Sequence, residues 1–246
     1  MKEKTAAVIV IPIVRTDLHD FELKSLAQCF KILKKWPKYF LAPEGIDLTK
    51  IKQLVNEEVK VAYFPTADFA SIADYNRLLT SQRFYKRFIA YDYMLIYQLD
   101  AYVFEDQLAY WCGKGYDFIG APAFFGEDYE RLTEADSERY SYALETQRLV
   151  FNGGFSLRKI KAMIRLLRIH NTLFPRWKGN EDMLFSLTSR RFTLLRPFVS
   201  LPSWKEALSF AFEKSPEASY EINNRKLPFG CHAWQRYHPD FWAKFM

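Results

Sequence analysis

The sequence lacks the features that mark membrane-spanning proteins and small disulfide- or zinc-stabilised proteins. No run of about 18 apolar residues, the length that a membrane span needs, occurs in it. The apolar run Ala6 to Val14 is much shorter, and no small-residue cleavage site follows it. The three cysteines, Cys29, Cys112 and Cys231, are too widely spaced for a zinc module or a disulfide framework. We therefore expect a cytoplasmic protein with reduced thiols, either soluble or peripherally attached.

Aromatic and basic side chains are, by contrast, plentiful. The 246 residues suit one α/β domain, and a hydrophobic fraction of 49% is ample for a core. Aromatic residues reach 17%, which fits a pocket for sugars or bases as well as a Phe-rich core. The net charge of +6 favours a polyanionic partner, such as a nucleotide diphosphate or an anionic lipid surface. No nucleic-acid motif is present, so we expect no nucleic-acid partner.

Apolar runs alternate with amphipathic stretches, which predicts a mainly parallel sheet flanked by helices. The run Tyr93 to Leu99 is the most apolar and is expected to be the central strand. Gly126 to Gln147 is polar and predicts a mobile loop or lid, whereas 228–246 is aromatic without periodicity. The predicted strands are 6–14, 39–42, 59–64, 93–99, 116–120 and 149–157, and the predicted helices are 21–30, 48–55, 71–88, 158–170 and 181–187.

Asp100 directly follows the expected central strand. Ligands of open α/β sheets bind at the carboxyl ends of the strands, which is where this carboxylate stands. Its oxygens suit Mg²⁺ or Mn²⁺, which in turn bridge phosphate oxygens. An aspartate in this position is also a common turn residue, so Asp100 alone leaves both interpretations open.

A glycine pair interrupts the strand-like segment around residues 149–157. Asn152 precedes Gly153 and Gly154, and the absence of two side chains lets a ligand or another chain approach the backbone. The amide of Asn152 could bond sugar hydroxyls. A hairpin or bulge is the alternative.

Two adjacent acids, Glu181 and Asp182, begin a predicted helix. Acids in a first turn are favoured by the helix dipole, so the pair could serve only as a cap. The functional interpretation is a catalytic carboxylate that removes a proton from an acceptor hydroxyl.

His232 lies among aromatic residues near the end of the sequence. It fits either a packed core histidine or a ligand to metal or phosphate. Arg77, in the helix before the Asp100 strand, could reach a diphosphate or could be an ordinary surface residue.

A basic face is predicted on the helix 158–170. Its side chains are either simply solvated or in contact with an anionic membrane surface. The basic residues at helical spacing are Arg158, Lys161, Arg165 and Arg168, and a second apolar patch could come from Trp234, Tyr237, Phe241, Trp242 and Phe245.

The ordered set of motifs resembles a poorly characterised family of bacterial and fungal GT-A-like glycosyltransferases, long catalogued as a domain of unknown function. The resemblance covers roughly residues 6–236. The motifs are Gln-x-Asp at 98–100, Tyr-Asp-Phe-Ile-Gly-Ala-Pro at 116–122, Asn-Gly-Gly-Phe-Ser-Leu-Arg at 152–158, Glu-Asp-x-x-Phe at 181–185, Phe-x-Phe-Glu at 210–213 and Pro-Phe-Gly-x-His-Ala-Trp at 228–234.

The resemblance implies an α/β fold consisting of one GT-A-like domain over 1–246. Residues of about 1–120 would form a Rossmann-like nucleotide-sugar-binding half, and those of about 121–246 an acceptor-binding and catalytic half. It implies transfer of a sugar from a nucleotide-sugar, for which we expect a UDP-sugar, to a hydroxyl of a glycan or lipid-linked acceptor. The implied catalytic base is Glu181 or Asp182, the metal ligands are Asp100 and His232, and the expected donor-binding residues are Pro12, Val14, Arg15, Arg77, Asp100, Ala101, Tyr102, Asn152, Gly153 and Gly154.

One departure from the GT-A pattern affects the expected cofactor. The usual signature is Asp-x-Asp, and here Tyr102 stands in place of the second carboxylate. Asp100, His232 and the diphosphate oxygens could still hold Mn²⁺ or Mg²⁺. The alternative is a metal-independent reaction in which basic side chains stabilise the departing diphosphate.

We thus expect an inverting hexosyltransferase of cell-surface polysaccharide or lipopolysaccharide synthesis, at the inner face of the cytoplasmic membrane, with a retaining route left open by the residues. Two alternatives remain. A nucleotidyltransferase of sugar metabolism usually needs a glycine-rich loop after the first strand, and Ile11 to Arg15 contains no glycine. A non-catalytic carbohydrate- or nucleotide-binding protein would suit the incomplete Asp-x-Asp signature.

Overall fold

The computed structural model describes residues 6–55, 57–123, 150–191 and 198–246. The polar segment Gly126 to Gln147 lies outside these residues, so the predicted loop or lid stays a prediction.

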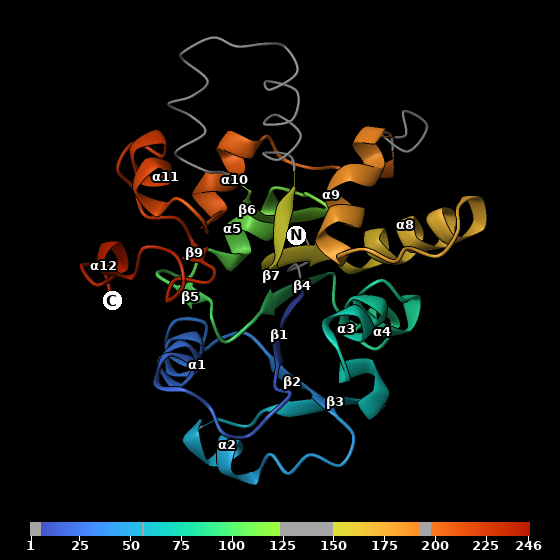
Figure 1. The fold of residues 1–246 in the computed structure, drawn as a ribbon, viewed down its shortest axis with the longest axis horizontal. Coiled ribbons are helices and arrows are strands. Elements are labelled where there is room, and N and C mark those ends of the chain that lie inside the picture. Colours follow the sequence, from blue (N-terminus) through green and yellow to red (C-terminus); the bar gives the residue numbers. More distant parts are fainter. Residues whose placement is uncertain (1–5, 56, 124–149, 192–197) are drawn as a thin grey trace, which may run out of the picture.

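Six strands form the main sheet in the order β3-β2-β1-β4-β7-β6 (Figure 1). The strands from β3 to β4 are parallel, and β7 runs antiparallel to both β4 and β6. The predicted α/β class with a mainly parallel sheet is confirmed. The bounds are β1 Ala7–Pro12, β2 Lys38–Pro43, β3 Lys60–Phe64, β4 Tyr93–Tyr97, β6 Phe118–Pro122 and β7 Phe151–Lys159.

Helices cover this sheet, and Figure 1 shows α1 on one side of β1 and β4, with α3, α4 and α8 on the other. The helix predicted over 71–88 is divided in two, because the hydroxyls of Thr80 and Ser81 bond the carbonyls of Asn76 and Leu78 and so end the first helix. The helices are α1 Asp20–Ile32, α2 Thr49–Leu54, α3 Ile72–Leu79, α4 Gln82–Lys86, α5 Leu108–Gly113, α8 Ile160–Leu173 and α9 Glu181–Arg191, with a 3-10 turn at Thr66–Phe69.

A second, small sheet was not predicted from the sequence. It has the order β5-β9-β8, with strands of only two residues each. Strands this short leave no periodic pattern in a sequence. The bounds are β5 Tyr102–Val103, β8 Ala211–Phe212 and β9 Gly230–Cys231, and the helices around it are α10 Trp204–Phe210, α11 Pro216–Ile222 and α12 Pro239–Trp242.

This small sheet corrects one expectation for the C-terminal aromatic residues. Phe241 and Trp242 form a buried cluster with Tyr102 and Phe212, and Trp242 is fully buried. They therefore contribute to a core. The prediction that they belong to a second apolar surface patch is wrong for Phe241 and Trp242. Burial of a large ring is a strong stabilising contribution, which explains how elements this short are held together.

The predicted basic face is also corrected at one residue. Arg158 belongs to β7 and is completely buried, because its guanidinium pairs with Glu181 inside the protein. Lys161, Arg165 and Arg168 are exposed on α8, as expected. No helix in the described ranges is long and apolar enough to cross a membrane.

The sheet order fixes where a ligand would bind. The chain runs from β1 outward to β2 and β3 on one side, and then returns to place β4 on the other side of β1. Such a reversal opens a crevice at the carboxyl ends of the two central strands. Here those ends are Pro12 on β1 and the residues after Tyr97 on β4.

Candidate active site

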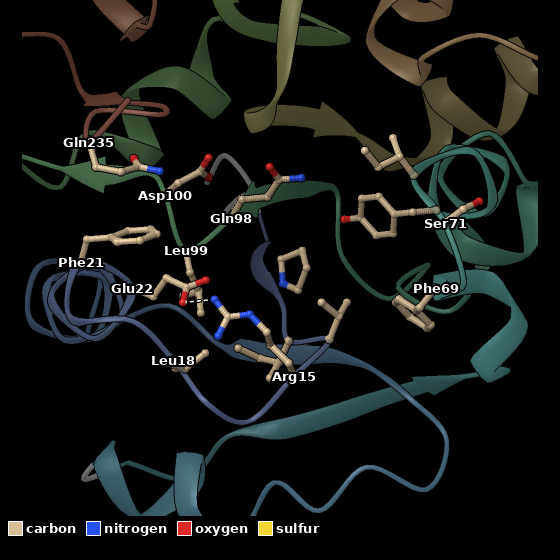
Figure 2. Close-up of a pocket in the computed structure, with 15 residues that line it drawn as sticks. Arg15, Leu18, Phe21, Glu22, Phe69, Ser71, Gln98, Leu99, Asp100 and Gln235 are labelled. Carbon is tan, nitrogen blue, oxygen red and sulfur yellow. Dashed lines mark hydrogen bonds and ion pairs between the residues drawn. The ribbon is translucent and has the colours of Figure 1, made fainter. Parts of the chain in front are cut away.

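A cavity of about 380 Å³ lies at this crevice. Its walls come from the segment after β1, the start of α1, the segment Phe69–Tyr75 and the end of β4, and Gln235 closes it (Figure 2). The predicted donor-site residues Pro12, Val14, Arg15 and Asp100 all line it.

Polar side chains lie on two opposite walls of the cavity. Figure 2 shows Asp100 between Gln98 and Gln235 on one wall, with Arg15 and Glu22 across from them. Arg15 donates a hydrogen bond to Glu22 on α1. The cavity therefore offers charged and amide groups above and below an apolar interior that includes Phe21 and Phe69.

Asp100 and His232, the two metal ligands that the resemblance implies, are close together. His232 Nε2 is 3.1 Å from Asp100 Oδ1 and 3.2 Å from Gln98 Oε1. The other ring nitrogen, Nδ1, donates to Glu213 Oε1 at 3.1 Å. His232 and Glu213 are buried, whereas 28% of the Asp100 side chain remains exposed on the cavity side.

The two carboxylates decide the charge of His232. Burial alone would lower the pKa of His232, but the hydrogen bonds and charges of Asp100 and Glu213 outweigh it and raise the pKa to about 10. For Asp100, burial would raise the pKa, and the hydrogen bond and charge of His232 outweigh it and lower the pKa. The three side chains thus form a carboxylate–imidazolium–carboxylate row that ends at the cavity.

The glycine pair lets functional side chains approach β7 from both of its faces. A Cβ on Gly154 would lie 2.1 Å from His232 Nε2, and one on Gly153 would lie 2.1 Å from Glu181 Oε1. Successive residues of a strand point to opposite faces, so the two glycines serve different neighbours. The predicted reason for the pair, close approach to the backbone, is met here by the protein's own side chains.

Glu181 is held in a buried ion pair. Arg158 Nη2 donates to Glu181 Oε1 at 2.8 Å and to the carbonyl of Gly153 at 3.0 Å. Nη1 of the same guanidinium donates to Tyr85 at 3.0 Å, and its plane lies over the Phe118 ring. The carboxylate of Glu181 is therefore held by this buried ion pair.

Asp182, the next residue, is in a different position. Its side chain is only partly buried, and its Oδ1 accepts from the backbone amide of Met183 at 2.6 Å. Burial first, and then the neighbouring charge of Glu181, raises its pKa from 3.8 to about 7. A carboxylate with a pKa near 7 is suited to general base catalysis at neutral pH.

Asp100 and His232 would offer a divalent cation two ligands if the cation displaced the proton from His232 Nε2, because a protonated imidazole has no free lone pair. Asp100 Oδ1 and His232 Nε2 converge within 3.1 Å, and carboxylate and imidazole are both common ligands of Mn²⁺. Glu213 takes the hydrogen of Nδ1, as outer-shell carboxylates of metal-bound histidines do. Within the described ranges, no group of three or more His, Cys, Asp or Glu side chains is arranged to hold a metal.

Six of the predicted donor-site residues do not line the cavity: Asn152, Gly153 and Gly154 on β7, and also Arg77, Ala101 and Tyr102. Arg77 pairs with Asp74 on the surface of α3 and is half exposed. Ala101 is buried, and its carbonyl accepts from Ser25 at 2.6 Å. Tyr102 lies in the small aromatic core.

Several residues at the site carry no recognisable signal in the sequence. Glu213 is only the last residue of the Phe-x-Phe-Glu motif, Tyr75 lies within the predicted helix 71–88, and Gln235 lies in the aromatic segment 228–246. The Tyr75 hydroxyl and Gln235 Oε1 are buried without a hydrogen-bond partner, and both residues line the cavity. Buried polar atoms are usually paired, so these two are suited to meet a polar ligand.

Comparisons with known proteins agree with the fold. The model of a family described as "Protein of unknown function (DUF5672)" matches residues 58–232. No curated protein matches the chain. Among solved structures, the apo structure of the bifunctional glycosyltransferase WbbM matches with a TM-score of 0.54 and 14% sequence identity, over 97% of this chain and 47% of the other. This chain thus spans about half the length of that protein, and the likeness confirms the predicted GT-A-like fold.

Proposed function

The chain belongs to the DUF5672 family of proteins of unknown function, and from the geometry of its site we propose that it is a glycosyltransferase. The donor is a nucleotide-sugar, with a UDP-sugar expected, and the acceptor is a hydroxyl of a glycan or lipid-linked saccharide. The proposal depends on one observation: Asp100, at the carboxyl end of β4, faces the cavity between β1 and β4 while bonded to His232.

The cavity is suited to a nucleoside diphosphate. Its apolar part, with Phe21, Phe69 and Tyr75, offers aromatic surface to a base and ribose. The diphosphate would end at Asp100, which lines the cavity and is paired with His232 behind it. A divalent cation bound by these two residues would supply positive charge to the departing diphosphate.

The proposed reaction is a direct displacement with inversion. Asp182 takes the proton of the acceptor hydroxyl, whose oxygen forms a bond to the anomeric carbon. The bond from that carbon to the diphosphate oxygen breaks, and its electron pair leaves with the nucleoside diphosphate. Glu181 stays paired with Arg158 and raises the proton affinity of Asp182 through its charge.

Asparagine in place of Asp100 is the direct test of the donor site. The variant keeps the size of the side chain but loses the charge, so we expect Mn²⁺-dependent turnover to fall about 10²-fold or more. UDP-, GDP-, CMP- and dTDP-sugars would be tested for binding and hydrolysis, with Mn²⁺ and with EDTA. Asp47→Asn, at an exposed turn, is the matched control and should behave as wild type.

Three outcomes would change the proposal. If no nucleotide binds, the glycosyltransferase assignment is rejected. Binding of a nucleotide-sugar without turnover over a range of acceptors would favour a non-catalytic binding protein. Undiminished metal-dependent turnover in Asp100→Asn would remove Asp100 from its role.

We further propose that the protein acts in cell-surface polysaccharide synthesis at the inner face of the cytoplasmic membrane, with α8 in contact with anionic lipid. Lys161 and Arg168 are exposed on this helix. Reversing both to glutamate should weaken co-sedimentation with phosphatidylglycerol vesicles, since each basic residue near such a surface contributes about 1 kcal/mol. The same reversal of Lys31 on α1 and of Lys34, in the turn after α1, is the control, since both are exposed; equal binding by both variants would reject the α8 surface.

A further inference from the structure

Glu213 has no role in the reaction proposed above, yet it contacts the residues that build the site. We propose that Glu213 is a positioning residue that fixes His232 toward Asp100 and ties this pair to the Asn-Gly-Gly segment of β7. The inference rests on the proposed function, because it assigns Glu213 to the same donor site.

One oxygen of Glu213 accepts hydrogen bonds from two side chains. Oε1 accepts from His232 Nδ1 at 3.1 Å and from Asn152 Nδ2 at 2.9 Å. The side chain is 9% exposed. Glu213 directly follows β8, which pairs with β9, and β9 ends immediately before His232.

Asn152 is itself held in a single orientation. Its Oδ1 accepts from the backbone amide of Gly154 at 2.6 Å, which leaves its amide hydrogens for Glu213. The carbonyl of Gly154 accepts from the backbone amide of Gln98 at 2.9 Å. The contacts of Glu213 therefore reach β7 and the segment that carries Asp100.

The backbone beside His232 is also fixed, so the side chain alone remains to be oriented. The amide of His232 donates to the carbonyl of Phe212 at 3.0 Å. With Nδ1 bound to Glu213, the other nitrogen faces Asp100 and Gln98. Without that acceptor the ring loses the hydrogen bond that fixes its Nδ1 side, and only the contacts of Nε2 with Asp100 and Gln98 remain to orient it.

The proposal is tested by Mn²⁺ affinity and by the ring protons of His232. Glu213→Ala removes the acceptor, and we expect Mn²⁺ affinity in the presence of UDP, measured by electron paramagnetic resonance, to fall about 10–100-fold. Glu213→Gln keeps an acceptor of the same size and should lose less, and Glu213→Asp should restore part of the affinity. In NMR spectra without metal, the exchange-protected Nδ1 proton of His232 should be present in wild type and Glu213→Gln but absent in Glu213→Ala.

Glu217→Gln is the matched control. Glu217 pairs with His238 Nδ1 at the same 3.1 Å, but both side chains are about half exposed. This variant should bind Mn²⁺ as wild type does. A Nδ1 proton that remains protected in Glu213→Ala would overturn the proposal. Failure of wild type to bind UDP or Mn²⁺ would instead reject the proposed function, and the NMR result would still decide the role of Glu213.

Discussion

Replacing Asp182 with asparagine is expected to reduce sugar transfer about 10²–10⁴-fold, the usual loss for a missing general base, while stabilising the folded protein at alkaline pH. Asparagine has nearly the same shape but cannot accept a proton. In the wild type, activity should rise with pH to a plateau above the Asp182 pKa of about 7.

The stability gain follows from the sign of the pKa shift. The Asp182 pKa is raised from 3.8 to about 7, so the folded protein holds a proton there that the unfolded chain has released. Stability therefore falls as pH rises between these two values, and the full cost is present above the upper one. Asparagine removes that cost, so the free energy of unfolding at about pH 8 should increase by about 1–4 kcal/mol.

Urea unfolding at acidic and alkaline pH measures this difference, alongside transfer assays. The gain should shrink as the pH falls toward the unfolded-state pKa. Asp240→Asn, at an exposed acid in the first turn of α12, is the control and should change neither property. Substantial transfer by Asp182→Asn would exclude Asp182 as the base, and a stability gain independent of pH would contradict the assigned pKa.

Methionine in place of Arg158 is expected to destabilise the protein by about 3–5 kcal/mol, because it leaves the buried carboxylate of Glu181 without a partner. The loss includes three further acceptors of this guanidinium, the oxygens of Tyr85, Gly153 and Ser156. Adding Glu181→Leu to this variant should recover part of the stability, since the uncompensated charge is then gone. Thermal or urea unfolding of the two single variants and the double variant measures this coupling.

Arg225→Met separates burial from ion pairing. Arg225 and Glu221 are 2.9 Å apart, close to the 2.8 Å of Arg158 and Glu181, but both are mainly exposed. Exposed pairs contribute little, so this variant should unfold almost as wild type does. Equal losses at both sites would show that burial is not the cause.

The central strands of the main sheet could be predicted because each is continuous in sequence and buried on both faces, whereas the edge strand β3 is partly exposed. β1 and β4 are entirely apolar for this reason, and Asp100 follows where the apolar run ends. The small sheet could not be predicted, because β5, β8 and β9 are each two residues long and meet only in the folded chain.

The same limit applies to the side chains of the site. Periodicity assigned Arg158 to an exposed helix face, whereas its buried partner, Glu181, lies 23 residues away in sequence. Glu213 and His232 are 19 residues apart, and no local pattern indicates their contact. The motifs pointed to Asp100, His232 and the glycine pair. Only the structure shows that Glu181, and not Asp182, is held in the buried ion pair with Arg158.

The glycine pair has a consequence for how substrate preference could change in this family. A Cβ on Gly153 would meet Glu181 and one on Gly154 would meet His232, so the backbone of β7 at these two glycines lies between the two side chains. In the proposed reaction, the strand backbone at this pair would help to set the distance between the acidic pair and the pair Asp100 and His232. Under this proposal, changes in specificity for the sugar or the acceptor would arise in the loops around β7, while the spacing set by the strand backbone stays the same.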